Sequence, residues 1–183
     1  VRHLADKSNS IDASQWKFST HYLDNEEWDP ITRTIKGSVL ESANSKVKVI
    51  FVPSYLKGDD GVFNKNYYEL LVGLDLTAFP SYYEPWGYTP LESVAFSVPT
   101  ITSNLSGFGA WATKLSNNLG VEVIRREENN DLYTVQQIVD ATLRYMQLNE
   151  QEMAEIRRSS LEVSEHALWK NFFKYYEAAY AEA

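Results

Sequence analysis

The sequence contains no cysteine, and this absence excludes two classes of site. Neither a disulfide framework nor a thiolate metal centre can form without cysteine. No apolar run approaches the roughly 18 residues that a membrane span requires, so no membrane partner is predicted. The three histidines, His3, His21 and His166, lack the mutual spacing of metal ligands, and we therefore predict no metal site.

Positive charge is also scarce. Lys and Arg total 17 against 25 Asp and Glu, which gives a net charge of -8. Nucleic-acid-binding surfaces are usually basic, so this balance argues against a nucleic-acid partner. Binding of a small anion through backbone amides needs no positive net charge.

A reducing cytoplasmic setting is the default expectation, and the sequence leaves association into a homo-oligomer open.

The chain that is present has the size of one ordinary domain. It has 183 residues, of which 44% are hydrophobic, enough to bury a substantial core. We treat residues 1–183 as a single domain. Because Val1 is not an initiator residue, we expect the chain to be a piece of a longer protein.

Strand-like and helix-like segments alternate along most of the sequence. Predicted strands occupy residues 16–23, 47–52, 75–81, 98–103 and 121–126. Predicted helices occupy residues 29–44, 66–74, 90–97 and 110–118, and the chain is predicted to be helical from Thr134 onward. This alternation predicts an α/β fold with a Rossmann-like parallel sheet flanked by helices and followed by C-terminal helices. The β-branched run "VKVIFV" at 47–52 is typical of a strand buried on both faces.

Capping residues and the spacing of apolar residues support three of the predicted helices. Asp29 is placed to N-cap the first helix, with Pro30 in its first turn. Thr134 and Gln137 have capping-box spacing. The residues that we expect on the buried face of that helix are Val135, Ile138, Val139, Thr142 and Met146. The last helix carries apolar and aromatic residues that we interpret as core, namely Leu168, Trp169, Phe172, Phe173, Tyr176 and Tyr180. The loop "NLSGFG" at 104–109 has two glycines, too few to indicate a phosphate site.

Two glutamates flank the turn "EPWGYTPLE", which follows a predicted strand. In open parallel sheets, ligands bind beyond the carboxyl ends of the strands. Thr89 has the spacing of an N-cap and Glu92 that of the third helical residue, so the pair is predicted to form a capping box. Glu84 lies in the loop and has no such structural role.

The same turn predicts an anion site. Gly87 allows close backbone approach, and the amides of Tyr88 and Thr89 lie at a helix start, where the helix dipole favours negative charge. A carboxylate beside a phosphate site suits a sugar nucleotide, because the amides hold phosphate and the carboxylate accepts hydrogen bonds from sugar hydroxyls.

The run "FPSYYEPWGYTPLES", followed by "VPTITSNLSGFG", resembles the donor-binding motif of glycogen synthases of the animal and fungal type. The similarity extends more loosely from "STHYL" to "LWKNFFKYY". The resemblance implies the C-terminal half of a two-domain GT-B glycosyltransferase. In that pattern Glu84 resembles the catalytic glutamate that contacts the donor glucose, and Glu92 the glutamate that holds the ribose. The backbone of Gly87, Tyr88 and Thr89 resembles the segment that receives the distal phosphate, and Tyr67 the tyrosine that stacks on uracil. Trp86 is expected to buttress the loop.

The activity implied is transfer of glucose, with retention, from a nucleotide sugar to the non-reducing end of an α-1,4-glucan. The donor is expected to be UDP-glucose rather than ADP-glucose, and no cofactor is implied. No double-displacement nucleophile is evident, so same-face attack assisted by the leaving diphosphate is the expected mechanism.

The sequence also departs from the family pattern. A glycine-rich acceptor domain and the Arg and Lys that grip the diphosphate are missing, so we expect the isolated chain to be inactive. The stretch "EQEMAEIRRSSLEVSE" offers only Arg157 and Arg158 where eukaryotic relatives carry an arginine-rich helix, and we interpret both as a solvated helix face. The phosphorylated tail of the animal enzymes is absent too, and the absence of this tail and of the arginine-rich helix favours a bacterial source.

Two alternatives stay open. One is a related retaining glycosyltransferase with another acceptor, such as trehalose phosphate or a cell-surface glycan. The other is a non-catalytic module that binds nucleotide or glycan. An unrelated doubly wound domain is disfavoured, because fold alone would not specify the turn.

Overall fold

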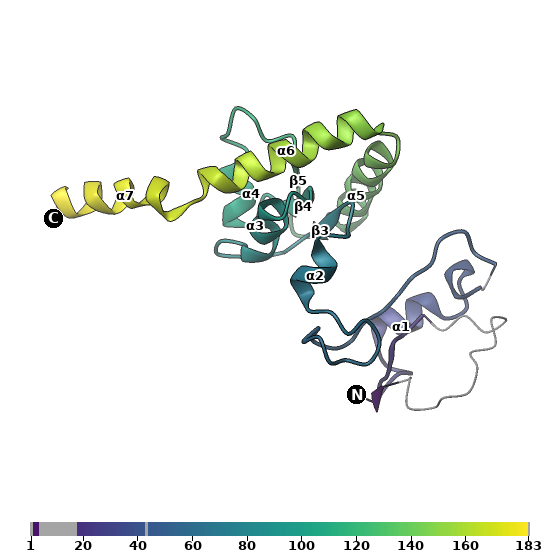
Figure 1. Cartoon of the computed structure of the whole chain (residues 1–183). Coiled ribbons are helices and arrows are strands. Elements are labelled where there is room, and N and C mark those ends of the chain that lie inside the picture. Colours follow the sequence, from purple (N-terminus) through teal and green to yellow (C-terminus); the bar gives the residue numbers. More distant parts are fainter. Residues whose placement is uncertain (1, 4–17, 43, 183) are drawn as a thin grey trace. The chain divides into compact units, whose positions relative to one another are not determined.

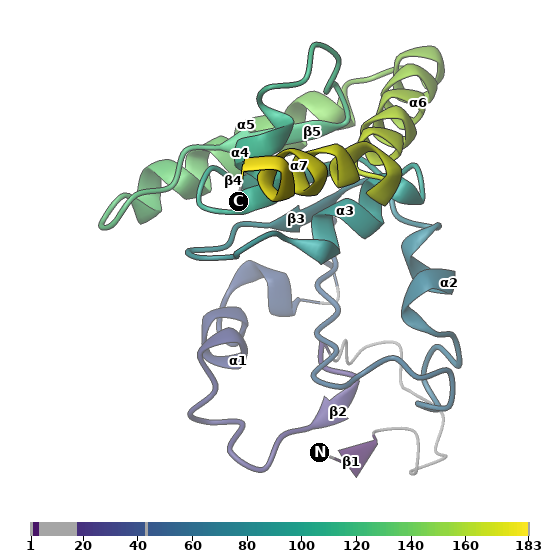
Figure 2. The same ribbon diagram turned by 90° about the vertical axis from the view of Figure 1, so that its left-hand side faces the viewer.

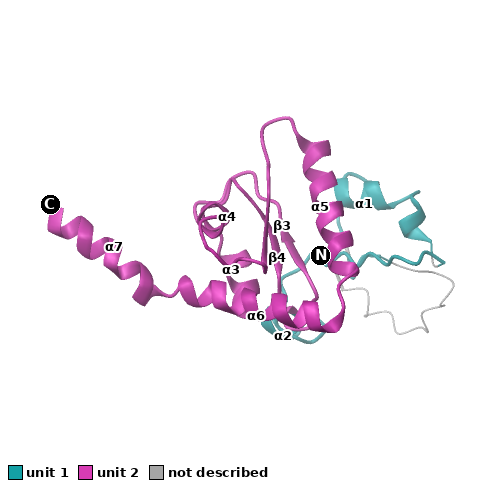
Figure 3. Cartoon of the chain, turned by 90° about the horizontal axis from the view of Figure 1, so that it is seen from above, with its two compact units in different colours: residues 1–70 teal, residues 71–183 magenta. Residues whose placement is uncertain are grey.

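The computed structural model describes residues 2–3, 18–42 and 44–182. The chain divides into two compact units, residues 1–70 and residues 71–183 (Figure 3). The assignment of residues 1–183 to one functional domain stays a prediction.

The first unit is built from short elements. Strand β1 (Arg2–His3) pairs antiparallel with β2 (His21–Tyr22), which lies within the predicted strand over 16–23. Helix α1 (Pro30–Ile35) begins as predicted, because the Thr32 amide donates to the Asp29 carboxylate at 2.7 Å. The predicted helix over 29–44 nevertheless breaks early. Gly37 has φ +75°, which is incompatible with a right-handed helix, and only the short 3-10 helix η2 (Val39–Glu41) follows.

The predicted buried strand over 47–52 is wrong. Only Phe51 makes a β-bridge, parallel to Ser19, with its amide 2.6 Å from the Phe18 carbonyl oxygen. Val47 and Ile50 are 61% and 54% exposed. A β-branched run becomes a buried strand only where neighbouring strands take its backbone hydrogen bonds and other elements cover its faces. Within the described residues, this segment has one such bridge.

The second unit contains a three-stranded sheet. Its strands are β3 (Thr77–Phe79), β4 (Thr100–Ser103) and β5 (Val121–Ile124), all parallel and in the order β3-β4-β5. The helices that cover it are α3 (Tyr88–Ala95) and α4 (Gly107–Ala112) on one face and α5 (Asp131–Met146) on the other (Figures 1 and 3). Three predicted strands are therefore confirmed, and so is the α/β fold class with its parallel sheet and C-terminal helices.

Each face of the sheet has its own core. The cluster under α3 and α4 consists of Val94, Phe108, Ala112, Val121 and Val163. On the other face Ala141 of α5 packs with Ile101 and Ile124, and Ile138 borders them. The predicted buried face of α5 is therefore only partly right. Ile138 lies toward the sheet, whereas Val135, Val139 and Met146 are 55%, 44% and 76% exposed. The small side chain of Ala141 allows close approach of helix and sheet, and this contact sets the rotation of the helix.

The predicted capping box at Thr134 and Gln137 is also wrong. Helix α5 begins earlier, at Asp131, because the Thr134 amide donates to the Asn130 carbonyl oxygen at 2.9 Å. The Gln137 side chain instead binds the Arg125 backbone, accepting from its amide at 2.8 Å and donating to its carbonyl at 2.9 Å. Gln137 therefore ties α5 to the end of β5.

Helix α6 (Glu150–His166) packs against α3 and is closed at its start by a capping box of Asn149 and Glu152. The interpretation of Arg157 as part of a solvated helix face is wrong. Its guanidinium donates to the Leu74 carbonyl at 3.1 Å and the Ser97 carbonyl at 3.3 Å, and it pairs with Asp75 at 3.1 Å. Arg157 thus joins α6 to the segments before β3 and β4.

Helix α7 (Trp169–Glu182) leaves the end of α6 and runs away from the sheet (Figures 1 and 3), and in Figure 2 it points toward the viewer. The interpretation of its aromatic residues as core is wrong for most of them. Trp169, Phe173 and Tyr180 are 61%, 46% and 77% exposed, because the sheet and its covering helices do not extend along this helix. Phe172 is the exception and packs on the rings of Trp86 and Trp111. No helix of the described residues combines the length and apolar character needed to cross a bilayer.

Candidate functional site

The candidate site is the loop between β3 and α3, residues 80–87, which we call the donor loop. Strand β3 delivers it to the carboxyl edge of the parallel sheet, where ligands of open α/β sheets bind. Helix α3 then leaves from its far end. The position that the sequence predicted for the two-glutamate turn is therefore confirmed.

Glu84 is fixed in the donor loop by backbone hydrogen bonds. It forms a parallel β-bridge with Ser106, in which its amide lies 3.4 Å from the Leu105 carbonyl and its own carbonyl accepts from the Gly107 amide at 3.0 Å. Its side chain is half-buried. This isolated bridge lies beyond the β3–β4 ladder, and its two hydrogen bonds fix the backbone of Glu84.

The segment after Glu84 rests on α4. The Trp86 carbonyl accepts from the Phe108 amide at 2.6 Å. The Trp86 ring packs against Phe108, Trp111 and Phe172, with ring centroids 6.1, 5.6 and 5.5 Å away. The expected buttressing role of Trp86 is therefore confirmed.

The two glycines of "NLSGFG" belong to α4 and not to the predicted loop, and each is required by a close contact with a backbone carbonyl. Helix α4 begins at Gly107, where Ser106 caps it by accepting from the Gly109 amide at 2.9 Å. A Cβ on Gly107 would lie 2.2 Å from the Pro85 carbonyl oxygen. A Cβ on Gly109 would lie 2.2 Å from the Ser103 carbonyl oxygen. Only glycine lets the helix start approach the donor loop at Gly107 and the end of β4 at Gly109 this closely.

Gly87 sets the start of α3. Its φ of +113° lies in the left-handed region, and it stands as the N-cap, so the helix begins at Tyr88. The first two helical amides are those of Tyr88 and Thr89, and Pro90 has none. A Cβ on Gly87 would lie 3.4 Å from Glu84 Cγ, which places the Glu84 side chain beside this first turn. The structure thus brings Glu84, Gly87, Tyr88 and Thr89 together.

The predicted capping box of Thr89 and Glu92 is wrong. Gly87 makes no side-chain cap, and the backbone of Thr89 is already helical, so the Thr89 hydroxyl is not in an N-cap position. The left-handed Gly87 starts the helix two residues earlier than the spacing predicted. Glu92 is half-buried, one turn beyond Tyr88, and it lies on the same side of α3 as Tyr88.

Tyr67 is the one predicted site residue in the first unit. It begins α2 (Tyr67–Leu71) and is half-buried, with its ring edge-on to that of Tyr68 at 5.4 Å between centroids. Asn66 and Glu69 form a reciprocal capping box at the start of this helix, at 2.8 and 3.0 Å, which the sequence reasoning missed. The stacking role of Tyr67 stays a prediction.

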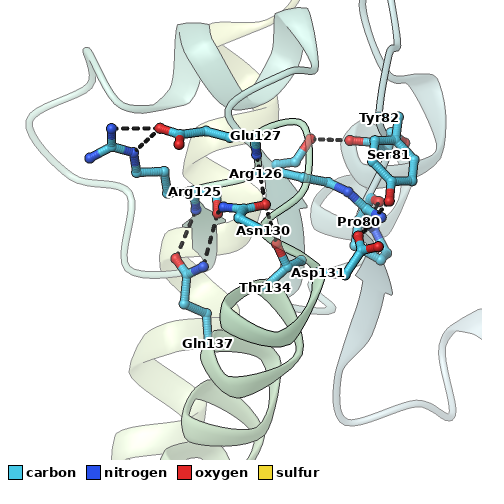
Figure 4. A network of polar contacts seen from close by, with 11 residues as sticks. Pro80, Ser81, Tyr82, Arg125, Arg126, Glu127, Asn130, Asp131, Thr134 and Gln137 are labelled. Carbon is cyan, nitrogen blue, oxygen red and sulfur yellow. Dashed lines mark hydrogen bonds and ion pairs between the residues drawn. The ribbon is translucent and has the colours of Figure 1, made fainter.

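Arg126 is a site residue that the sequence reasoning missed. It had been assigned to the end of a strand, but β5 ends at Ile124 and Arg126 reaches across to the donor loop (Figure 4). Its guanidinium lies 3.4 Å from the centroid of the Tyr82 ring and donates to the Pro80 carbonyl. It also pairs with Asp131 at 3.4 Å. The signal available in the sequence was an arginine at the end of a predicted strand, because ligands bind at that edge of a parallel sheet.

Comparison with known proteins identifies the relatives of this chain. A family model described as glycogen synthase matches residues 10–183. The chain is 32% identical over 157 residues to glycogen [starch] synthase isoform 1 of Saccharomyces cerevisiae, covering 82% of this chain and 22% of that protein. It is 30% identical over 167 residues to glycogen [starch] synthase of Dictyostelium discoideum, covering 90% of this chain and 19% of that protein. It is 40% identical over 94 residues to the liver glycogen [starch] synthase of Homo sapiens, covering 51% of this chain and 13% of that protein.

The chain therefore spans about a fifth of the length of the first two of these relatives. The predicted family resemblance is confirmed. All three relatives are eukaryotic, and the expectation of a bacterial source has no support from them.

Proposed function

The chain belongs to the glycogen synthase family, and from this premise we propose that residues 1–183 form its donor-binding half. The reaction is transfer of glucose, with retention, from UDP-glucose to the non-reducing end of an α-1,4-glucan. The observation that carries the proposal is the position of the Glu84 side chain beside the first turn of α3, 3.4 Å from the Cβ site of Gly87.

The first turn of α3 is proposed to receive the distal phosphate of the donor. The amides of Tyr88 and Thr89 have no acceptor within the helix, and the helix dipole places partial positive charge there. Gly87 has no side chain to obstruct a phosphate, and a Cβ would already crowd Pro90 Cγ at 3.1 Å. This arrangement binds an anion through backbone groups, in agreement with the acidic net charge of the chain.

The two glutamates take different parts of the donor. Glu84 contacts the glucose in this proposal, which is supported by its backbone bridge to Ser106 and by the position of its Cγ beside Gly87. Glu92 lies one turn along α3 and binds the ribose hydroxyls. Tyr67 stacks on the uracil, an interaction that also tolerates adenine.

Catalysis by these residues consists of positioning and electrostatic stabilisation. The helix-start amides stabilise the negative charge that develops on the leaving diphosphate. The leaving diphosphate takes the proton of the attacking glucan hydroxyl on the same face, which retains the anomeric configuration. Glu84 orients the glucose for that attack. The glucan site and the Arg and Lys that grip the diphosphate are proposed to lie in other parts of a longer synthase, so residues 1–183 alone should bind nucleotide with little turnover.

Transfer assays on the full-length synthase test this function. We expect labelled glucose to pass from UDP-glucose to glycogen faster than from ADP-glucose. The lack of transfer from either donor would refute the proposal. A different acceptor, such as a phosphorylated sugar, would be detected in the same assay by adding it in place of glycogen.

Calorimetric titration of residues 1–183 with UDP and ADP tests nucleotide binding directly. We expect weak UDP binding that Tyr67→Ala abolishes. The matched control is Tyr55→Ala, which removes a tyrosine that is 86% exposed and should leave binding unchanged. Equal loss in both variants would contradict the stacking role of Tyr67.

A further inference from the structure

We propose that Arg126 is a positioning residue that holds the first part of the donor loop, residues 80–82, so that Glu84 meets the donor glucose in one orientation. This inference rests on the proposed function. The side-chain contacts of Arg126 are with Pro80, Tyr82 and Asp131, so we assign it a role through the loop.

The contacts of Arg126 converge on one short segment (Figure 4). One terminal nitrogen donates to the Pro80 carbonyl, and the guanidinium plane lies 3.4 Å from the Tyr82 ring centroid. The other terminal nitrogen is 3.4 Å from Asp131, whose carboxylate also accepts from the Tyr82 hydroxyl. Arg126 and Asp131 therefore hold Tyr82 by its ring face and its hydroxyl together.

The burial of Arg126 distinguishes this cluster from a surface ion pair. Its side chain is only 12% exposed, whereas the neighbouring Arg125 side chain is 72% exposed and pairs with Glu127. Exposed ion pairs contribute little, but a buried guanidinium that loses its partners leaves an uncompensated charge. The flat, five-donor guanidinium can serve a carbonyl, a carboxylate and an aromatic face at once, which a lysine cannot.

Arg126 is itself fixed by the strand next to its own. Its amide donates to the Asn104 side chain at 2.6 Å, and Asn104 follows β4 directly. The Ser103 hydroxyl, at the end of β4, donates to the Ser81 carbonyl at 2.6 Å. Residues 80–82 are thus held from the ends of β4 and β5, while residues 84–86 are held by α4.

These separate anchors predict that loss of Arg126 affects kcat and the KM for UDP-glucose differently. The phosphate and ribose contacts are proposed to lie on α3, whose buried Ser93 and Val94 anchor it independently of Arg126. Glu84 follows Tyr82 by two residues in the same loop, so loss of Arg126 should disturb Glu84 and the glucose more than the nucleotide contacts on α3. We expect kcat to fall and the KM for UDP-glucose to change little.

The test uses the full-length synthase with UDP-glucose and glycogen. We expect Arg126→Ala to lower kcat by about 10-fold to 100-fold, the cost of a misplacement approaching 1 Å, with KM for UDP-glucose within about threefold. Arg125→Ala is the matched control and should keep the wild-type kcat and KM.

If Arg126→Ala does not fold, Arg126→Lys is measured instead. Lys can reach only one of the two oxygen partners, so its kcat should also lie below the wild-type value. Wild-type kcat in Arg126→Lys or in folded Arg126→Ala would overturn the inference.

A double-mutant cycle separates positioning from general destabilisation. If Arg126 acts through Tyr82, the variant with both Arg126→Ala and Tyr82→Leu should lose no more kcat than the worse single variant. Losses in kcat that multiply would overturn the inference. A wild-type synthase that transfers no glucose refutes the proposed function, whereas an active wild type with an unaffected Arg126→Ala refutes only the role of Arg126.

Discussion

Gly107→Ala tests the packing of α4 against the donor loop, because two physical effects of the substitution have opposite signs. Gly107 is the first residue of α4 and is half-buried. In a helix without steric conflict, Gly→Ala stabilises by roughly 0.5–1 kcal/mol. Here the new Cβ would lie 2.2 Å from the Pro85 carbonyl oxygen and 3.2 Å from Trp86 Cα. Both are backbone atoms, which cannot rotate away.

The magnitude follows from the contacts that the methyl group would break. Relief of the clash requires α4 and the donor loop to separate, and overpacking of this kind costs about 1–3 kcal/mol. The separation also stretches the Gly107–Glu84 and Phe108–Trp86 backbone hydrogen bonds, now 3.0 and 2.6 Å, each worth about 1 kcal/mol. After subtraction of the gain in helix propensity, we expect a net loss of about 2–4 kcal/mol in the free energy of unfolding.

Urea unfolding followed by tryptophan fluorescence measures this loss. At a slope of about 2 kcal/mol per M, the midpoint should fall by about 1–2 M, and UDP binding should weaken with it. The control is Ala110→Gly at an exposed position of the same helix, which should cost only about 0.5–1 kcal/mol by propensity. A midpoint that rises in Gly107→Ala would refute the reasoning, since propensity would then outweigh the contact with the loop.

Three further predictions concern single side chains. Glu84→Gln in the full-length synthase should lose most of its turnover while UDP affinity measured by calorimetry stays at the wild-type value; near-wild-type kcat would contradict its role. Glu92→Gln should weaken UDP binding by about tenfold through loss of a charged hydrogen bond. Unchanged UDP affinity in this variant would contradict the proposed ribose contact of Glu92. Burial, reinforced by Glu122, raises the pKa of the Tyr145 hydroxyl from 10.0 to about 12. The unfolded chain therefore releases this proton first, and stability present below pH 10 is lost as the pH rises toward 12. Tyr145→Phe should flatten the decline in urea midpoint over this range, and an unchanged slope would contradict the shift.

Several features of the fold were predictable because they depend on neighbours in sequence. Asp29 caps α1 because a carboxylate one residue before the helix reaches its first amides wherever the helix lies. The strands of the second unit were recognisable as short runs rich in β-branched residues and bounded by turns. The donor loop was recognisable because the residue types of its turn are specific, and its place after β3 put it at the ligand-binding edge.

Most of the failures depend on distant partners, whereas the one at Thr89 depends on the backbone of nearby Gly87. The 47–52 run has strand propensity, but propensity supplies no neighbouring strand. Thr89 has capping spacing, but Gly87 adopts a left-handed φ that starts the helix earlier. The aromatic stripe of α7 has the spacing of a buried face, yet periodicity does not say whether another element covers that face.

The sequence alone therefore determined the fold class, the family and the identity of the donor loop, since these follow from local pattern and from residue types in order. Tertiary structure alone decided which groups hold the loop in place. Arg126 follows Tyr82 by more than forty residues, and the two meet only because parallel strands β3, β4 and β5 bring their carboxyl ends to one edge. Gly107 is small because the Pro85 carbonyl lies against it, a contact that no spacing rule encodes. Such contacts are short-ranged in space but not in sequence, and they exist only once the sheet has formed.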